Sequence, residues 1–267
     1  MAAQLFVLAA LYLLGGRHVR GGNGPEPMPA TCPRAAVIMP LTGDAPGMRE
    51  AVASILDQDY PDLLLVFVTA SAADPAVALL SGLVGNDARV LQVVAGQATT
   101  CGQKNHNILA GIRAAATAEV FVFCDSSHVA DRHFVTNLVA PIARGDAPMS
   151  SGFHKIVPLD GHTATIGMLV TCLALHLMQP IKAITQPWGG AMALSREAFD
   201  RFGLREIWNK NIVDDFSMGP HLHRFGVKAW PVAGACLATP MPLSSCGQNQ
   251  MSRSVAVAPT FTKFVPS

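Results

Sequence analysis

The chain contains 267 residues, of which 50% are hydrophobic and 14% are charged, and its formal net charge is +1. This length and apolar content suit one large domain with a substantial core. A nucleic-acid-binding protein would show a basic stripe, so the near-neutral charge argues against nucleic acid as a partner. Soluble proteins usually carry about a quarter charged residues, and the shortfall favours contact with a membrane surface or another apolar partner.

Residues 1–20 are expected to form a hydrophobic membrane anchor. The first part of this segment is apolar apart from Gln4, although it is shorter than the roughly 20 residues that a bilayer-spanning helix needs. Arg17 and Arg20 follow the apolar run, whereas a cleaved signal peptide carries its positive charge before it. We therefore expect a short anchor with the next domain on the cytoplasmic side. A helix packed on that domain is the alternative.

A Gly- and Pro-rich linker at 21–33 is followed by alternating strand and helix patterns up to Asp125. Continuous apolar runs predict the strands, and apolar residues at helical spacing predict the helices between them. The predicted strands are 35–40, 63–69, 89–94 and 120–125, and the predicted helices are 48–56, 73–83 and 104–116. This alternation predicts an α/β, Rossmann-like fold with a mostly parallel sheet flanked by helices.

After Asp131 the alternation of strand and helix patterns is less regular. Residues 133–142 are expected to be helical, 149–157 extended and 166–181 helical. The helix at 166–181 is hydrophobic almost all round. Such a helix is either buried in a core or placed at a membrane, and both alternatives stay open.

Asp125 directly follows the apolar run Val120–Cys124. Ligands of open α/β sheets bind in the crevice beyond the carboxyl ends of the strands, where this carboxylate is expected to lie. One carboxylate can hold Mg²⁺ or Mn²⁺ when the diphosphate of a nucleotide supplies further oxygen ligands. The alternative is a carboxylate that caps the next helix.

Asp214 and Asp215 form a second acidic point, at an expected helix start. Adjacent residues on a helix point in different directions, so the two carboxylates are expected to have different roles. One of them can act as a general base if it reaches the acceptor. The alternative is that both simply stabilise the amino end of the helix.

The segment Gln186–Ala193 is expected to be a turn that contains Trp188, Gly189 and Gly190. Glycines allow close approach of the backbone to a ligand, and an aromatic ring can stack on a sugar. A purely structural turn is the alternative. The sequence contains no GxSxG, GxGxxG or Walker motif, which argues against serine hydrolases, dehydrogenases and P-loop enzymes.

In their order along the chain, these features resemble family-two glycosyltransferases of the GT-A fold, and most closely the ceramide glucosyltransferase-like branch. The resemblance covers residues 34–254, which we expect to form the catalytic domain, and leaves 255–267 as an irregular tail that we expect to be truncated. The segments that carry it are 36–40 with 54–61, 68–76, 102–107, 124–127 and 213–218.

The resemblance implies inverting transfer of a hexose from a nucleotide sugar, usually UDP-linked, to a lipid hydroxyl such as that of ceramide or a hopanoid-type lipid. It implies a membrane-associated enzyme with its catalytic domain on the cytoplasmic face. Asp215 would be the catalytic base, and Asp125 would hold Mg²⁺ or Mn²⁺. The expected nucleotide-sugar-binding residues are Ser71, Asp74, Lys104 and Asp125. The expected acceptor-binding residues are Trp188, Gly189, Asp214, Gln250 and Arg253.

One motif departs from the branch. The branch ends its catalytic region with Gln-x-x-Arg-Trp, whereas this chain has Gln250-Met-Ser-Arg253-Ser254. A catalytically impaired relative that binds nucleotide or a partner is therefore the alternative function. A nucleotidyltransferase would share the aspartate at the strand end but carries a basic Gly-rich loop, and residues 43–47 lack the basic residues.

Overall fold

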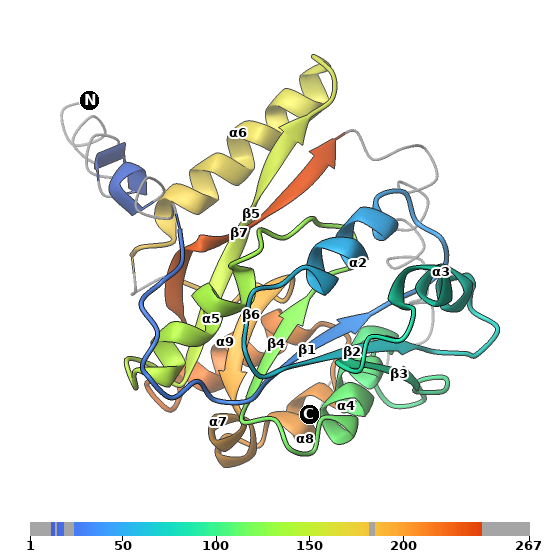
Figure 1. Ribbon diagram of the computed structural model, residues 1–267. Helices are drawn as coiled ribbons and strands as arrows, with labels where there is room; N and C mark the ends of the chain where they lie inside the picture. The colour runs from blue at the N-terminus through green and yellow to red at the C-terminus, as the bar shows by residue number, and fades with distance from the viewer. Residues whose placement is uncertain (1–11, 14, 19–23, 182–184, 242–267) are drawn as a thin grey trace, which may run out of the picture.

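The computed structural model describes residues 12–13, 15–18, 24–181 and 185–241, which build a seven-stranded mixed sheet flanked by helices (Figure 1). In sheet order the strands are β3 (Val90–Val94), β2 (Leu63–Thr69), β1 (Ala35–Pro40), β4 (Val120–Cys124), β6 (Ala191–Ser195), β5 (Met149–Pro158) and β7 (Trp230–Met241). The helices are α2 (Met48–Leu56), α3 (Pro75–Val84), α4 (Gln103–Ala114), α5 (Phe134–Ala143), α6 (Thr163–Met178), α7 (Arg196–Arg201), α8 (Leu204–Trp208) and α9 (Asp214–His223).

The first half of the chain has the predicted strand and helix order. Strand β1 lies between β2 and β4, and these three strands and β3 all run parallel. Strands β1, β2 and β4 form continuous apolar runs because both faces of the sheet are covered there, whereas the edge strand β3 is largely exposed. Val37 faces a core formed with α2, α3 and α5, whereas Ile38 faces a second core formed with α4, α8 and α9. The predicted α/β architecture is therefore confirmed.

The second half of the sheet is where prediction and structure differ. Strand β6 runs antiparallel to β4 and to β5, while β7 runs parallel to β5. The sheet is therefore mixed, and four of its six strand pairings are parallel. The turn predicted at 186–193 is wrong for residues 191–193, which belong to β6, because the alanines of this short strand give a weak strand signal. Strand β7 contains Pro231 and Pro240, which a sheet tolerates at its edge.

Helix α6 packs on β5 and projects along the long ends of β5 and β7 (Figure 1). Its buried side chains include Cys172 and His176. Its outer surface exposes five large apolar residues: Ile166, Met168, Val170, Leu173 and Leu175. Most of α6 is therefore apolar surface rather than buried core.

Within the described part of the chain, no helix combines the length and apolar character needed to cross a membrane. The predicted anchor at 1–20 lies for the greater part outside the described residues. Gly15 packs against Leu177 of α6 without room for a β-carbon, so the described end of that segment lies beside α6 (Figure 1). The predicted tail 255–267 is outside the described residues.

Candidate functional site

The predicted site lies at the carboxyl end of β4, where three distant segments meet. Asp125 follows β4 directly. Because β6 is antiparallel to β4, the 186–190 loop that precedes β6 lies beside the residues that follow β4, and the Asp125 amide donates to the Gly190 carbonyl at 3.3 Å. Helix α9 begins next to this loop with Asp214 and Asp215. The fold therefore brings Asp125, Trp188, Gly189 and the acidic pair into one region.

Lys104 joins the acidic residues of the two halves of the chain. Its Nζ lies 2.7 Å from Asp125 Oδ1 and 3.1 Å from Asp214 Oδ2. Lys104 is the second residue of α4, where a positive charge opposes the helix dipole, so its position is explained by the carboxylates rather than by the helix. Burial by itself would lower the pKa of Lys104, but Asp125 and Asp214 outweigh this effect and raise it. The amine is therefore a permanent cation of the site.

Asp125 and Asp214 differ in exposure and in proton affinity. Burial acts to raise the pKa of Asp125, but Lys104 outweighs burial and holds it below the ordinary value. For Asp214 burial dominates and raises the pKa, assisted by the neighbouring Asp215 and Asp125. The Asp125 side chain is 30% exposed, whereas that of Asp214 is 3% exposed. Asp125 can therefore reach a ligand from solvent, while Asp214 serves as the buried counter-charge of Lys104.

The contact between Lys104 and Asp214 is an ion pair rather than a well-aligned hydrogen bond. Among the described residues, Asp214 Oδ2 has no hydrogen-bond partner although it is fully buried. An ammonium group 3.1 Å from a carboxylate oxygen attracts it even when the hydrogen-bond angle is poor. The predicted role of Asp214 in acceptor binding stays a prediction.

Asp215 is hydrogen-bonded to the 186–190 loop. Its Oδ2 accepts a hydrogen bond from the Gly189 amide at 2.9 Å, and its Oδ1 accepts one from the Phe216 amide at 2.7 Å. Asp215 is partly exposed, and each carboxylate oxygen keeps a second lone pair for a further donor. The two adjacent aspartates therefore do face different surroundings, and Asp215 is the one with access to an incoming hydroxyl.

The paired glycines are required by side chains of the protein itself. A β-carbon at Gly189 would collide with the Asp214 carboxylate, and one at Gly190 would collide with the Trp188 ring. The predicted reason for these glycines was close approach of a ligand. The structure provides a different reason, because the loop packs directly on the acidic pair.

Two histidines that the sequence did not single out adjoin the site. The Trp188 ring stacks on His154 with 4.6 Å between ring centroids, and the His128 ring lies 5.3 Å from it. Thr239 Oγ1 lies 2.9 Å from His128 Nδ1 and 3.0 Å from His154 Nδ1. Burial lowers the pKa of His128 to about 4 and also lowers that of His154. These rings therefore form an uncharged aromatic wall beside Asp125.

The sequence gives little sign of this aromatic wall. The histidines share no metal-binding spacing, and the pairing of β5 with β7 that brings Thr239 to them is not readable from the chain. The one available signal is that His128 follows the strand-end Asp125 by three residues.

Ser71 and Asp74 lie after β2, at the same edge of the parallel sheet as Asp125. Asp74 caps α3, because its Oδ1 accepts hydrogen bonds from the Ala76 amide at 2.9 Å and from the Gly43 amide at 2.8 Å. Ser71 is exposed. Their role in nucleotide binding stays a prediction. The predicted acceptor residues Gln250 and Arg253 lie outside the described residues.

The side chains of the site can bind a divalent metal ion only if phosphate oxygens supply further ligands. In the described ranges, no three His, Cys, Asp or Glu side chains are grouped so that they could hold a metal ion. Asp125 offers a partly exposed, ionised carboxylate, the type of hard oxygen ligand that Mg²⁺ and Mn²⁺ prefer. Mg²⁺ is commonly bound by one or two carboxylates plus substrate phosphates and water. Asp125 therefore suits an ion that is shared with a diphosphate.

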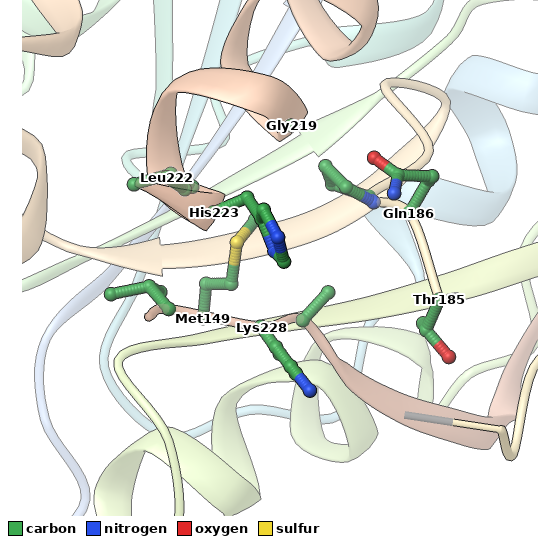
Figure 2. Close-up of a pocket in the computed structure, with 10 residues that line it drawn as sticks. Met149, Thr185, Gln186, Gly219, Leu222, His223 and Lys228 are labelled. Atoms are coloured by element: carbon green, nitrogen blue, oxygen red, sulfur yellow. The ribbon is translucent and has the colours of Figure 1, made fainter. Parts of the chain in front are cut away.

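Figure 2 shows a cavity lined by residues 185–187, Met149 of β5, residues of α9 and the segment 227–229 that precedes β7. Gln186 and Thr185 border it on one side, and Met149, His223 and Lys228 on the other. Its volume of about 20 Å³ suits a single water molecule, not a sugar nucleotide. A wider groove of about 720 Å³ lies at the far end of β6, around Arg201 and Phe225. Neither space is lined by Asp125 or Asp215, so neither coincides with the predicted site.

Two solved structures of similar fold are glycosyltransferases. A mannosyltransferase, PcManGT from Pyrobaculum calidifontis in complex with GDP-Man and Mn²⁺, matches 94% of this chain and 70% of its own, with a TM-score of 0.62 and 19% identity. GalNAc-T7 with UDP, GalNAc and Mn²⁺ matches 81% of this chain with a TM-score of 0.58 and 13% identity. This chain covers 45% of the GalNAc-T7 chain. At such identities the likeness establishes the fold, which is that of the GT-A glycosyltransferases.

The family is established by the sequence itself. The model of glycosyl transferase family 21 matches residues 2–254, and the chain belongs to this family. The family number two that the resemblance suggested is therefore wrong, whereas the ceramide glucosyltransferase branch fits. No curated protein matches the chain.

Proposed function

We propose that this glycosyltransferase is an inverting enzyme that transfers a hexose from a UDP-linked sugar to the hydroxyl of a membrane lipid, with ceramide or a hopanoid-type lipid as the acceptor class. The observation that supports this proposal best is the arrangement of Asp125 and Asp215 around one loop and one lysine. Asp125 is bound to Lys104, and Asp215 is bound to Gly189. The site therefore has a charged donor side and a separate carboxylate for the acceptor.

The donor side is formed by Asp125, Lys104 and the end of β2. Asp125 would hold Mg²⁺ or Mn²⁺ together with the diphosphate of the nucleotide. When bound, the ion neutralises charge on the diphosphate as the glycosidic bond breaks. Lys104 supplies a second positive charge at the same place, and Ser71 and Asp74 would adjoin the nucleotide. The two similar structures contain nucleotide and Mn²⁺, which supports this part of the proposal.

The acceptor side is formed by Asp215 and the 186–190 loop. Asp215 would take the proton of the attacking hydroxyl, and attack opposite to the leaving diphosphate inverts the anomeric centre. Gly189 holds the carboxylate by its amide. The Trp188 ring, stacked on His154, offers a flat apolar face for the sugar or the acceptor. Asp214, Gln250 and Arg253 complete the proposed acceptor set.

Helix α6 supports the proposal of a lipid acceptor and a membrane-associated protein. The sequence of α6 contains no Asp, Glu, Lys or Arg. Its five exposed large apolar residues form a surface of the kind that marks an interaction site. We propose that this surface lies in the lipid interface, with the catalytic domain on the cytoplasmic face.

A donor screen tests the proposed function. Purified protein is incubated with Mn²⁺, a panel of UDP- and GDP-sugars and lipid vesicles that contain ceramide or hopanoid alcohols, and nucleotide release is measured together with the glycolipid product. Release with one donor, dependent on lipid acceptor and metal, is expected. Binding of Mn²⁺ and UDP without release by any donor would favour the impaired relative, for which Ser254 in place of the motif Trp is the supporting observation.

A further inference from the structure

One buried side chain ties the 186–190 loop to strand β5. The Ser151 hydroxyl is 0% exposed and accepts a hydrogen bond from the Trp188 amide at 3.0 Å. The next amide along the chain, that of Gly189, donates to Asp215 Oδ2 at 2.9 Å. Two consecutive amides of the loop therefore connect a buried serine with the proposed catalytic base.

Ser151 can reach the loop because β5 is irregular at this point. Its register against β7 shifts between Ser151 and Phe153, as in a β-bulge, which re-aims a side chain. The bulge is itself fixed, because Gln179 Nε2 donates to the Gly152 carbonyl at 2.6 Å and a β-carbon at Gly152 would collide with the Ala235 carbonyl. The backbone next to Ser151 is therefore held in a fixed position.

We propose that Ser151 is a positioning residue of the transfer reaction. By holding the Trp188 amide it fixes the Gly189 amide, and the Gly189 amide orients the Asp215 carboxylate towards the acceptor. This assignment rests on the proposed function, since it has a catalytic meaning only if Asp215 is the base. A positioned base acts in the transition state, so loss of Ser151 is expected to lower kcat and to leave donor binding at Asp125 unchanged.

Ser150 provides a matched control on the same strand. It is also 0% exposed, but its hydroxyl donates to the Leu138 carbonyl on helix α5. Ser150→Ala and Ser151→Ala each remove one buried hydroxyl, and only the second touches the loop. We expect Ser151→Ala to lower kcat roughly 10- to 100-fold with a donor KM within about twofold of wild type, whereas Ser150→Ala keeps kcat within about twofold. Thermal melting and Mn²⁺-dependent UDP binding of both variants report on folding and on the donor side.

An equal loss of kcat in both variants, or a loss in Ser151→Ala that falls on donor KM or UDP affinity, would overturn the assignment. If Ser151→Ala does not fold, Ser151→Thr and Ser151→Cys decide. Threonine keeps the hydroxyl acceptor and is expected to keep most of kcat, whereas the thiol is a weak acceptor and is expected to lower kcat roughly tenfold. Equal kcat in these two variants would overturn the assignment. Failure of the proposed function looks different, because wild type would then transfer no sugar.

Discussion

The sharpest prediction concerns Lys104, whose removal leaves Asp214 buried without its counter-charge. The change is Lys104→Met, which keeps most of the side-chain volume and removes the ammonium. The ion pair with the 30% exposed Asp125 contributes little, up to about 1 kcal/mol. Leaving Asp214, whose side chain is 3% exposed, with no partner costs about 1–3 kcal/mol. We therefore expect the free energy of unfolding to fall by about 1–4 kcal/mol.

Urea and thermal unfolding measure this loss. With a melting-temperature shift of about 2–4 °C per kcal/mol for a domain of this size, the expected decrease in Tm is about 2–16 °C. Lys210→Met removes an exposed lysine and is the control, with an expected change within about 0.5 kcal/mol. Adding Asp214→Asn to Lys104→Met removes the uncompensated charge, so the double variant is expected to regain part of the lost stability.

The deficit of Lys104→Met also depends on pH. Burial raises the pKa of Asp214 in the folded protein above 3.8, so folding favours the protonated acid. The stability that this provides is present below pH 3.8 and is lost as the pH rises through the folded pKa. Loss of the cation raises that pKa further, so the deficit of the variant is expected to narrow as the pH falls from neutral. Equal stability of the Lys104→Met and Lys210→Met variants, or no rescue by Asp214→Asn, would refute the proposed charge arrangement.

Three further predictions follow from the same contacts. Gly189→Ala places a methyl group against the Asp214 carboxylate, so we expect the free energy of unfolding in urea to fall by about 1–3 kcal/mol. An unchanged free energy of unfolding would show that the loop does not pack on Asp214. Burial lowers the pKa of His128 to about 4, so the stability of wild type is expected to fall as the pH falls from 6.5 towards 4. In melting curves, His128→Gln should make this pH dependence of stability smaller, and the same pH dependence in wild type and variant would contradict the burial of a neutral ring. Leu173→Glu on α6 is expected to lower binding to lipid vesicles in a flotation assay, whereas Leu91→Glu on the edge strand β3 should leave this binding unchanged. Equal vesicle binding by the two variants would count against α6 as the lipid-binding surface.

The sequence predicts the first half of the fold well because β1, β2 and β4 are buried on both faces. Strands β1 and β2 have the predicted bounds, since their apolar runs are continuous and are followed by clear breaks. The antiparallel β6 and the edge strand β7 were missed, because alanine in β6 and proline in β7 give weak strand signals. Their pairing is decided by the sheet, not by their own propensity.

The candidate site, too, could be predicted from the sequence only in part. Asp125 and Asp215 could be selected from their positions at a strand end and a helix start. That Lys104 joins Asp125 to Asp214 could not be foreseen, because the contact connects segments far apart in sequence. For Asp74, the structure shows a helix cap, the ordinary alternative for an aspartate in that place. Trp188 could be selected from the sequence, but its stacking with His154 and His128 could not, because it depends on the β5–β7 pairing.

The most direct test of the account compares wild type, Asp125→Ala and Asp215→Asn in two measurements, UDP binding with and without Mn²⁺ and sugar transfer to lipid vesicles. We expect Mn²⁺-dependent UDP binding in wild type, its loss in Asp125→Ala, and its retention in Asp215→Asn with transfer reduced roughly 100- to 10,000-fold. Equal UDP affinity with and without Mn²⁺ in wild type, or full transfer by Asp215→Asn, would contradict the roles proposed for these two carboxylates.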